Sequence, residues 1–121
     1  MLKRVRSTFY WSPDLDRSVG FYRDVLGMDL VSRYEDDWAE FDIGGDRLAL
    51  HGSRGAAPPV NGATVVFEVE DLDTAMNALI GKGVIFDGDV VEIPEGGGRF
   101  ASFRDPAGNL LQILEPPQGA P

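Results

Sequence analysis

The chain contains one histidine, His51, at the end of a short apolar stretch in the segment GGDRLALHGSRG. A histidine there could bind a metal ion, act as a general acid or base, or form an uncharged hydrogen-bonding wall of a pocket. Glu40 and Glu68 are further candidates for a general base. The role of His51 depends on the residues beside it in the folded protein, and therefore on the elements that position it.

The composition excludes several classes of site and partner. The 121 residues fit one domain, 1–121, and carry a formal net charge of -9. An acidic surface repels nucleic-acid phosphates and anionic lipids, so we expect neither partner. Since there is no cysteine, disulfides, thiolate metal sites and cysteine nucleophiles are excluded. No apolar run has membrane-spanning length and the N-terminal residues lack the apolar core of a secretory signal, which predicts a cytoplasmic protein.

The first half of the chain has the pattern of a strand, a helix and three more strands. Aromatic and β-branched residues predict a strand over residues 5–11. Ser12 and Pro13 indicate the start of a helix whose apolar residues continue at helical spacing to Leu26, and Gly27 is expected to end it. Acidic and glycine-rich turns then separate three predicted strands: Asp29–Tyr34, Trp38–Ile43 and Arg47–His51.

The second half repeats this order. A predicted strand, Thr64–Val69, leads into a helix through Asp-Leu-Asp at 71–73, as the first strand does at 14–16. The repeat predicts two βαβββ modules, about 1–52 and 62–121, joined by a linker at about 53–61. Neither module is large enough to bury a core alone. The further strands predicted in the second module are Val84–Phe86, Val90–Ile93, Arg99–Arg104 and Leu110–Leu114.

Two segments, DLDRSVGFYRDVLGMDL and FRDPAGNLLQILEP, resemble the vicinal oxygen chelate superfamily. That superfamily includes glyoxalase I, bleomycin-resistance proteins and extradiol dioxygenases. The resemblance implies an α+β fold in which the sheets of two βαβββ modules curl around a cleft, and it also implies a homodimer. In the metal-using members, four cleft side chains from the first and last strands of each module, typically histidine or glutamate, hold a divalent ion.

Aligned with that pattern, this chain lacks the usual metal ligands. The first-strand positions fall on Ser7 and Thr64, and the last-strand position of the second module falls on Gln112. The fourth position is Ala49, or His51 if the alignment slips by two residues. Hydroxyl and amide groups bind Zn²⁺, Ni²⁺ or Fe²⁺ poorly, so no metal or other cofactor is expected at these positions. Whether other residues bind a divalent ion is left open.

Strand alternation predicts which side chains face the cleft. If Ser7 faces it, Phe9 and Trp11 do as well, while Thr8 and Tyr10 pack toward the helix layer. Aromatic walls with a few polar groups suit a flat, partly apolar ligand. The alternative is that the aromatic residues belong to the core or a dimer interface, and that the polar ones are satisfied wall residues. The candidate ligand-binding residues are Ser7, Phe9, Trp11, Trp38, His51, Thr64 and Gln112.

Three functions are compatible with these features. The first is a metal-independent protein, similar to the bleomycin-resistance branch, that sequesters a small organic drug or metabolite; an acidic surface favours cationic ligands. The second is a glyoxalase-like lyase or isomerase acting on a small carbonyl or vicinal-oxygen substrate, with His51 as the best candidate base. The third is a metabolite sensor or partner subunit with a vestigial cleft. Whether the protein is an enzyme is left open.

Overall fold

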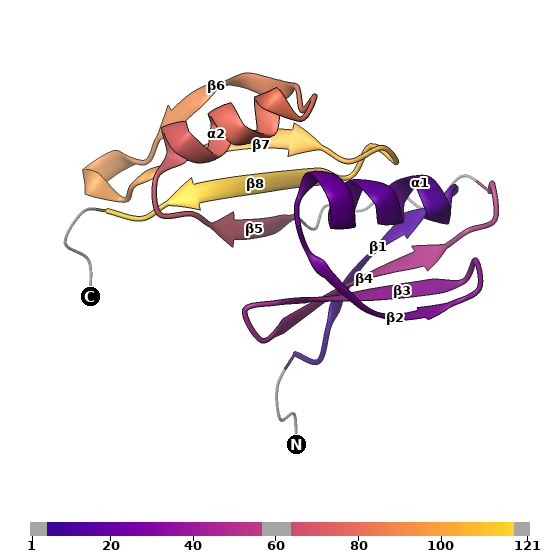
Figure 1. Cartoon of the computed structure of the whole chain (residues 1–121). Coiled ribbons are helices and arrows are strands. Elements are labelled where there is room, and N and C mark those ends of the chain that lie inside the picture. The colour runs from indigo at the N-terminus through magenta and orange to yellow at the C-terminus, as the bar shows by residue number, and fades with distance from the viewer. Residues whose placement is uncertain (1–4, 57–63, 118–121) are drawn as a thin grey trace. The chain divides into compact units, whose positions relative to one another are not determined.

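A computed structural model describes residues 5–56 and 64–117 (Figure 1). The chain divides into two compact units, Met1–Gly62 and Ala63–Pro121. Residues 57–61 of the predicted linker lie outside the described residues, and the single-domain organisation stays a prediction. In the described part of the chain, no helix has the length and apolar character needed to cross a lipid bilayer.

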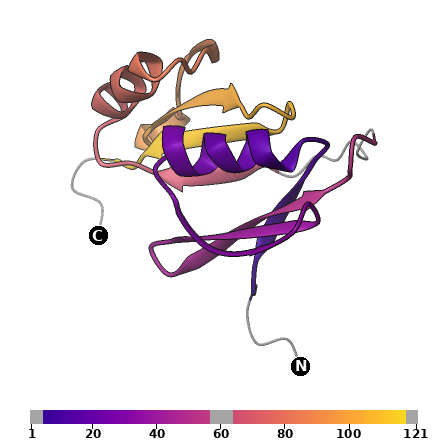
Figure 2. The ribbon, with the colours of Figure 1, turned by 45° about the vertical axis from the view of Figure 1, so that its right-hand side comes forward.

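The first unit is a four-stranded sheet with one helical segment on one face. Figure 2 shows that segment above the sheet. The strand order is β1-β4-β3-β2, with β1 parallel to β4 and the other neighbours antiparallel. The elements are β1 (Thr8–Ser12), α1 (Leu15–Gly20), the π-helical continuation η1 (Phe21–Val25), β2 (Asp29–Tyr34), β3 (Trp38–Ile43) and β4 (Asp46–Gly52).

The second unit has the same topology. Its strand order is β5-β8-β7-β6, again with the first and last strands parallel. The repeat read from the sequence is therefore confirmed as two copies of one α+β arrangement. The elements are β5 (Val65–Glu68), α2 (Leu72–Gly81), β6 (Phe86–Glu92), the short 3-10 turn η2 (Pro94–Gly96), β7 (Arg99–Arg104) and β8 (Leu110–Glu115).

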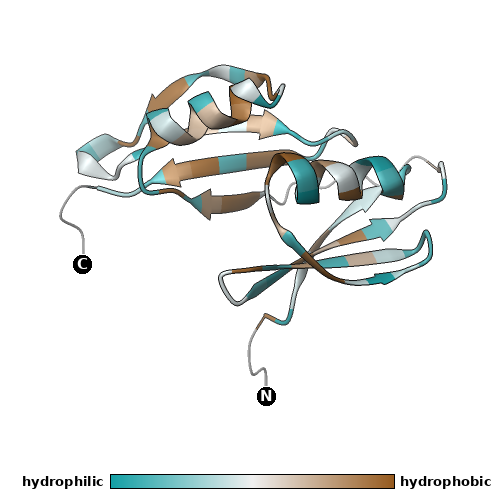
Figure 3. Cartoon of the chain, in the orientation of Figure 1, coloured by the Kyte–Doolittle hydropathy of each residue, from teal (hydrophilic) through white to brown (hydrophobic). Residues whose placement is uncertain are grey.

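The core of the first unit lies between the helical segment and the sheet. Asp14 caps α1 by accepting a hydrogen bond from the Arg17 backbone N at 3.1 Å, which satisfies one of the free amides at the helix start. Each large apolar side chain buried there contributes about 1.5–3 kcal/mol. Figure 3 shows hydrophilic and hydrophobic residues alternating along α1. The buried apolar residues of the first unit include Leu15, Val19, Tyr22, Phe41, Leu48 and Leu50.

The start of the first helix differs from the sequence prediction. The first strand covers Thr8–Ser12 rather than residues 5–11, and Ser12 ends it instead of starting the helix. The Ser12 hydroxyl, fully buried, donates to the Asp14 carbonyl and shares a hydrogen bond with Ser18 Oγ. It therefore ties the strand end to the helix, while Asp14 supplies the cap. The uninterrupted α-helix expected up to Leu26 instead becomes a π-helix at Phe21.

The predicted strands Val84–Phe86 and Val90–Ile93 are wrong as separate elements. One strand, β6, covers Phe86–Glu92, and its pairing with β7 shifts between Asp87 and Val91. Gly88 lies inside this irregularity with φ of 71°, a conformation that glycine adopts without strain. The Asp-Gly pair that resembles a turn in the sequence therefore forms a bulge within one strand.

Candidate functional site

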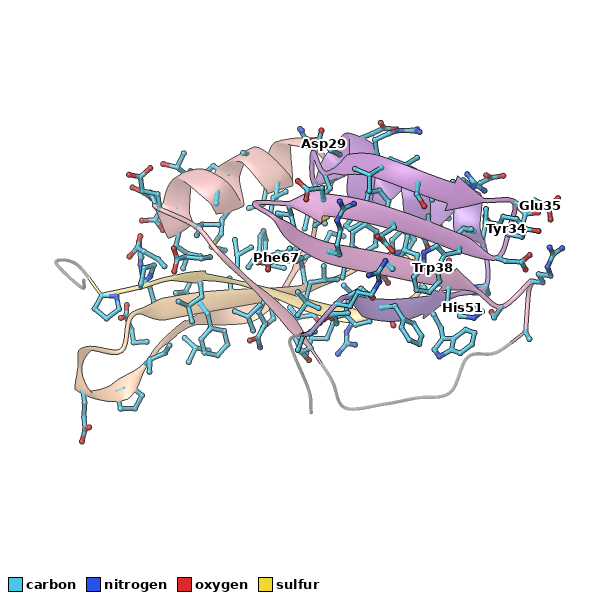
Figure 4. The ribbon with its side chains drawn as sticks, turned by 90° about the horizontal axis from the view of Figure 1, so that it is seen from below. Asp29, Tyr34, Glu35, Trp38, His51 and Phe67 are labelled. Carbon is cyan, nitrogen blue, oxygen red and sulfur yellow. The ribbon has the colours of Figure 1, made fainter. Side chains whose placement is uncertain are left out.

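The aromatic residues predicted on β1, β3 and β4 lie on one face of the first sheet. We call the face opposite α1 the distal face. Trp11 pairs with His51 and His51 with Trp38, so the three side chains form one row across three strands. Tyr34 pairs with Trp38 and extends the row to the edge strand β2. Figure 4 shows Tyr34, Trp38 and His51 at the same end of the sheet.

Phe9 lies on the same face as this row. We call the rings of Phe9, Trp11, Trp38 and His51 the aromatic cluster. The His51 ring centre lies 4.1 Å from that of Trp11 and 5.8 Å from those of Trp38 and Phe9. The Phe9 ring centre is 5.8 Å from Trp11 and 5.9 Å from Trp38. Phe9 stays 43% exposed, so the cluster is in contact with solvent rather than part of the core under α1. The rings of the cluster meet in edge-to-face and tilted pairs, which aromatic side chains prefer over a parallel sandwich.

The hydrogen bond of His51 fixes its tautomer. Nδ1 lies 3.1 Å from the carbonyl oxygen of Gly52. A carbonyl can only accept, so Nδ1 donates, and the neutral ring therefore has its lone pair on Nε2. His51 can thus accept a hydrogen bond or take a proton at Nε2.

Glu40 is the acidic residue next to the cluster. Its Oε1 accepts a hydrogen bond from Trp38 Nε1 at 3.3 Å, which orients the indole. Its Oε2 lies 3.8 Å from an Arg47 nitrogen, and the Glu40 side chain is 23% exposed. Arg47 is also 3.8 Å from Asp42, so it is shared between two carboxylates.

The turn between β2 and β3 holds the end of β4, where His51 lies. The backbone N of Gly52 donates to the Asp37 carbonyl at 2.9 Å. Arg54 donates to both Asp37 carboxylate oxygens, at 2.8 and 3.0 Å. The Arg54 hydrogen bonds hold the pKa of Asp37 below its usual range. These bonds fix the strand end that carries His51.

Tyr34 was not predicted as a site residue, although the sequence indicates that it pairs with Trp38. The predicted strands ended at Tyr34 and began again at Trp38, with only Glu-Asp-Asp between them. A hairpin with that loop pairs the residues on either side of it, which gives the observed Tyr34–Trp38 pair.

The predicted polar positions lie in both units. Ser7 directly precedes β1, and Thr64 directly precedes β5. Gln112 pairs with Val66 and with Ser102, and its Nε2 donates to Ser102 Oγ at 3.2 Å. The structure thus brings together the aromatic candidates of the first unit, and it places the polar candidates Thr64 and Gln112 in the second.

The strand register shows which residue of the first unit corresponds to Gln112 of the second. Phe9 pairs with Ala49 as Val66 pairs with Gln112, so Ala49 is the repeat equivalent of Gln112. The groups at the four expected metal positions are then two hydroxyls, an amide and a methyl, which do not suit a divalent transition metal. Within residues 5–56 and 64–117, no three histidine or acidic side chains gather as metal ligands would.

The topology and the internal repeat match a known family. Residues 4–113 match the sequence model of the Glyoxalase/Bleomycin resistance protein/Dioxygenase superfamily. The chain belongs to this superfamily. A relative of this chain is the uncharacterized protein YraH of Bacillus subtilis (strain 168). The two are 31% identical over 115 residues, which cover 84% of this chain and 90% of YraH.

Solved structures share the superfamily fold with this chain. TnmS3, an antibiotic binding protein from Streptomyces sp. CB03234, is 25% identical, with a TM-score of 0.76 over 95% of this chain and 97% of its own. A lactoylglutathione lyase from Agrobacterium tumefaciens is 22% identical, with a TM-score of 0.80 over 94% of each chain. At 22% identity, the similarity to the lactoylglutathione lyase concerns the fold alone. One superfamily fold thus occurs in a binding protein and in an enzyme.

Proposed function

We propose that this superfamily member binds a flat, partly apolar organic molecule on the aromatic cluster and sequesters it without converting it and without a metal. The observation that carries the proposal is the contact among four rings from three strands, one of which, Phe9, is 43% exposed. Exposed aromatic rings held in place by a sheet offer a large apolar surface at little cost in conformational entropy.

Other features support sequestration. The groups at the four expected metal positions do not suit a divalent ion, and a similar fold occurs in the antibiotic binding protein TnmS3. We further propose that Ser7, which directly precedes β1, supplies a polar contact to the ligand. A homodimer and a cytoplasmic location complete the proposal.

The two tryptophans of the chain provide the assay. Both Trp11 and Trp38 belong to the cluster, so a ligand bound there changes the intrinsic fluorescence of the protein. The experiment titrates a panel of aromatic drugs and follows this fluorescence, and then recovers each compound to check that it is chemically unchanged. If no compound in the panel alters the emission or raises the melting temperature up to millimolar concentration, binding at the cluster is refuted.

A matched pair of variants locates the binding. Phe9→Leu removes an exposed ring of the cluster, and Phe21→Leu makes the same change on η1, away from the cluster. We expect Phe9→Leu to weaken binding by about threefold to tenfold, the equivalent of roughly 1 kcal/mol for one ring contact. Phe21→Leu should leave the affinity unchanged. Equal losses in both variants would place the ligand elsewhere.

A second candidate function is a glyoxalase-like lyase or isomerase. The observation in its favour is the His51 tautomer, because a neutral ring with its lone pair on Nε2 can take a proton from a bound substrate. A fold neighbour is a lactoylglutathione lyase. The test follows a thiol–aldehyde adduct by chromatography in the presence of the protein and of His51→Gln. Conversion that His51→Gln abolishes while binding persists would favour this enzyme over sequestration.

A further inference from the structure

Two polar side chains at the aromatic cluster, His51 and Glu40, offer hydrogen-bond acceptors to a ligand. The His51 Nδ1 proton is used by the Gly52 carbonyl, which leaves a lone pair on Nε2. Trp38 Nε1 donates to Glu40, which as a carboxylate has further lone pairs to offer. A ligand that matches these two side chains must bring donors of its own.

The charge on this part of the distal face is negative. Glu40 and Asp42 on β3 share one cation, Arg47, at 3.8 Å from each. Both distances exceed the 2.7–2.9 Å of a strong charged hydrogen bond, so Arg47 does not saturate either carboxylate. Two carboxylates and one guanidinium leave one negative charge beside the rings, in a chain with a net charge of -9.

The rings themselves favour positive charge. The face of an indole or phenyl ring carries a partial negative charge, and a cation within about 6 Å of its centre is attracted by roughly 0.5–2 kcal/mol. Trp38 donates to Glu40 through its ring N–H, which lies in the plane of the indole, so the carboxylate sits at the edge of this ring. The Glu40 side chain is 23% exposed and can be reached from solvent.

We infer that the ligand of the aromatic cluster is an organic cation, an aromatic ring that carries a protonated nitrogen. The ring packs on the cluster, and the protonated nitrogen lies against Glu40. This inference rests on the proposed function and adds the chemical class of the ligand.

Three probes of one shape test the charge. They are 1-naphthylmethylamine, 1-naphthylmethanol and 1-naphthoic acid, which at pH 7 are positive, neutral and negative. Calorimetric titration of the full chain measures each Kd. We expect the amine to bind about tenfold more tightly than the alcohol and the acid to bind most weakly. Raising the ionic strength from about 0.05 to about 0.5 M should weaken the binding of the amine alone.

Two variants with the same change in charge test the residue. Glu40→Gln removes the carboxylate at the cluster. Asp46→Asn removes one at the exposed start of the neighbouring strand, where Asp46 pairs with Ile43 and points to the opposite face. We expect Glu40→Gln to bring the amine and the alcohol to within about threefold of each other, and Asp46→Asn to preserve their difference.

The outcomes separate the two proposals. If the amine and the alcohol bind the natural chain equally, the charge inference fails and the proposed function stands. The inference is also overturned if Glu40→Gln abolishes the binding of all three probes while its melting curve stays unchanged. Glu40 would then act only by orienting Trp38. If none of the probes binds the natural chain, the inference and the proposed function both fail. The comparison of probes on the natural chain needs no variant to fold.

Discussion

Glu115 at the end of β8 accepts a hydrogen bond from the backbone N of Leu72 at the start of α2, at 2.9 Å and across 43 residues of sequence. The other side of the same carboxylate binds Arg99, at 3.1 Å from Nε to Oε2. Arg99 also reaches Asp73 at 3.1 Å. One carboxylate thus joins the last strand, its neighbour β7 and the start of the helix in the second unit.

Glu115→Gln should lower the melting temperature by a few degrees. The amide can still accept from the Leu72 N–H, but it loses the charge that pairs with Arg99. Calorimetry measures the shift. Glu70→Gln, the same change at an exposed position, serves as the control and should leave the melting temperature unchanged. A shift of equal size in both variants would mean that the network adds nothing to stability.

The Glu115 network predicts a loss of stability in acid. Hydrogen bonds from Arg99, followed by the Leu72 N–H, hold the pKa of Glu115 below its usual range. The unfolded chain, in which a glutamate has a pKa of about 4.3, therefore takes up the proton first as pH falls. The contribution is complete above that value and disappears as pH falls through the lower pKa of the folded state.

Urea unfolding of the natural chain and of Glu115→Gln over a pH series measures this effect. The difference in free energy of unfolding between them should be constant from about pH 6 to 8 and should shrink below about pH 4. A difference that stays constant down to pH 3 would contradict the assigned pKa direction.

Gly52→Ala should destabilise the first unit by about 2 kcal/mol or more, because no rearrangement of a side chain can make room. A Cβ at this position would lie 1.8 Å from the backbone oxygen of Asp36. Gly20→Ala is the matched control with the opposite expected sign. Gly20 is helical and its Cβ would have ordinary contacts, so alanine there should stabilise by about 0.5–1 kcal/mol. Chemical denaturation gives both values, and a neutral Gly52→Ala would refute the close contact.

Asp105→Ala should cost about 1–3 kcal/mol of stability. The buried Asp105 carboxylate accepts from the backbone N of Ala107 and Asn109, at 2.9 and 2.8 Å, and from Asn109 Nδ2 at 2.8 Å. These bonds close the turn between β7 and β8. Asp89→Ala, at an exposed position on β6, should change stability by less than about 0.5 kcal/mol. Equal effects in the two variants would show that the turn does not depend on the carboxylate.

Local patterns were sufficient to predict most of the elements. The strands Asp29–Tyr34, Trp38–Ile43 and Arg99–Arg104 have the predicted bounds, because alternation and turn residues delimit them. Strand alternation puts Trp38 and Glu40 on one face of β3, and the register shows that His51 lies on that same face.

Features that depend on tertiary contacts could not be predicted in this way. The bulge at Gly88 resembles a turn until its pairing with β7 is known. The Glu115–Leu72 bond needs the fold to bring together residues far apart in sequence. The choice between Ala49 and His51 as the repeat equivalent of Gln112 needed the register, since both residues lie on one face of β4. The His51 tautomer needed its carbonyl partner.

The two units share one pattern of strand pairing, yet the row that carries Trp11, His51 and Trp38 in the first unit carries Glu68, Leu114 and Phe100 in the second. The backbone framework is thus specified twice in the chain, whereas the row of aromatic side chains is specified once. Side chains on a distal face can change while the helix-facing residues continue to hold the framework. A duplicated framework of this kind allows recognition to evolve, or to be transplanted from one half to the other, without a new fold.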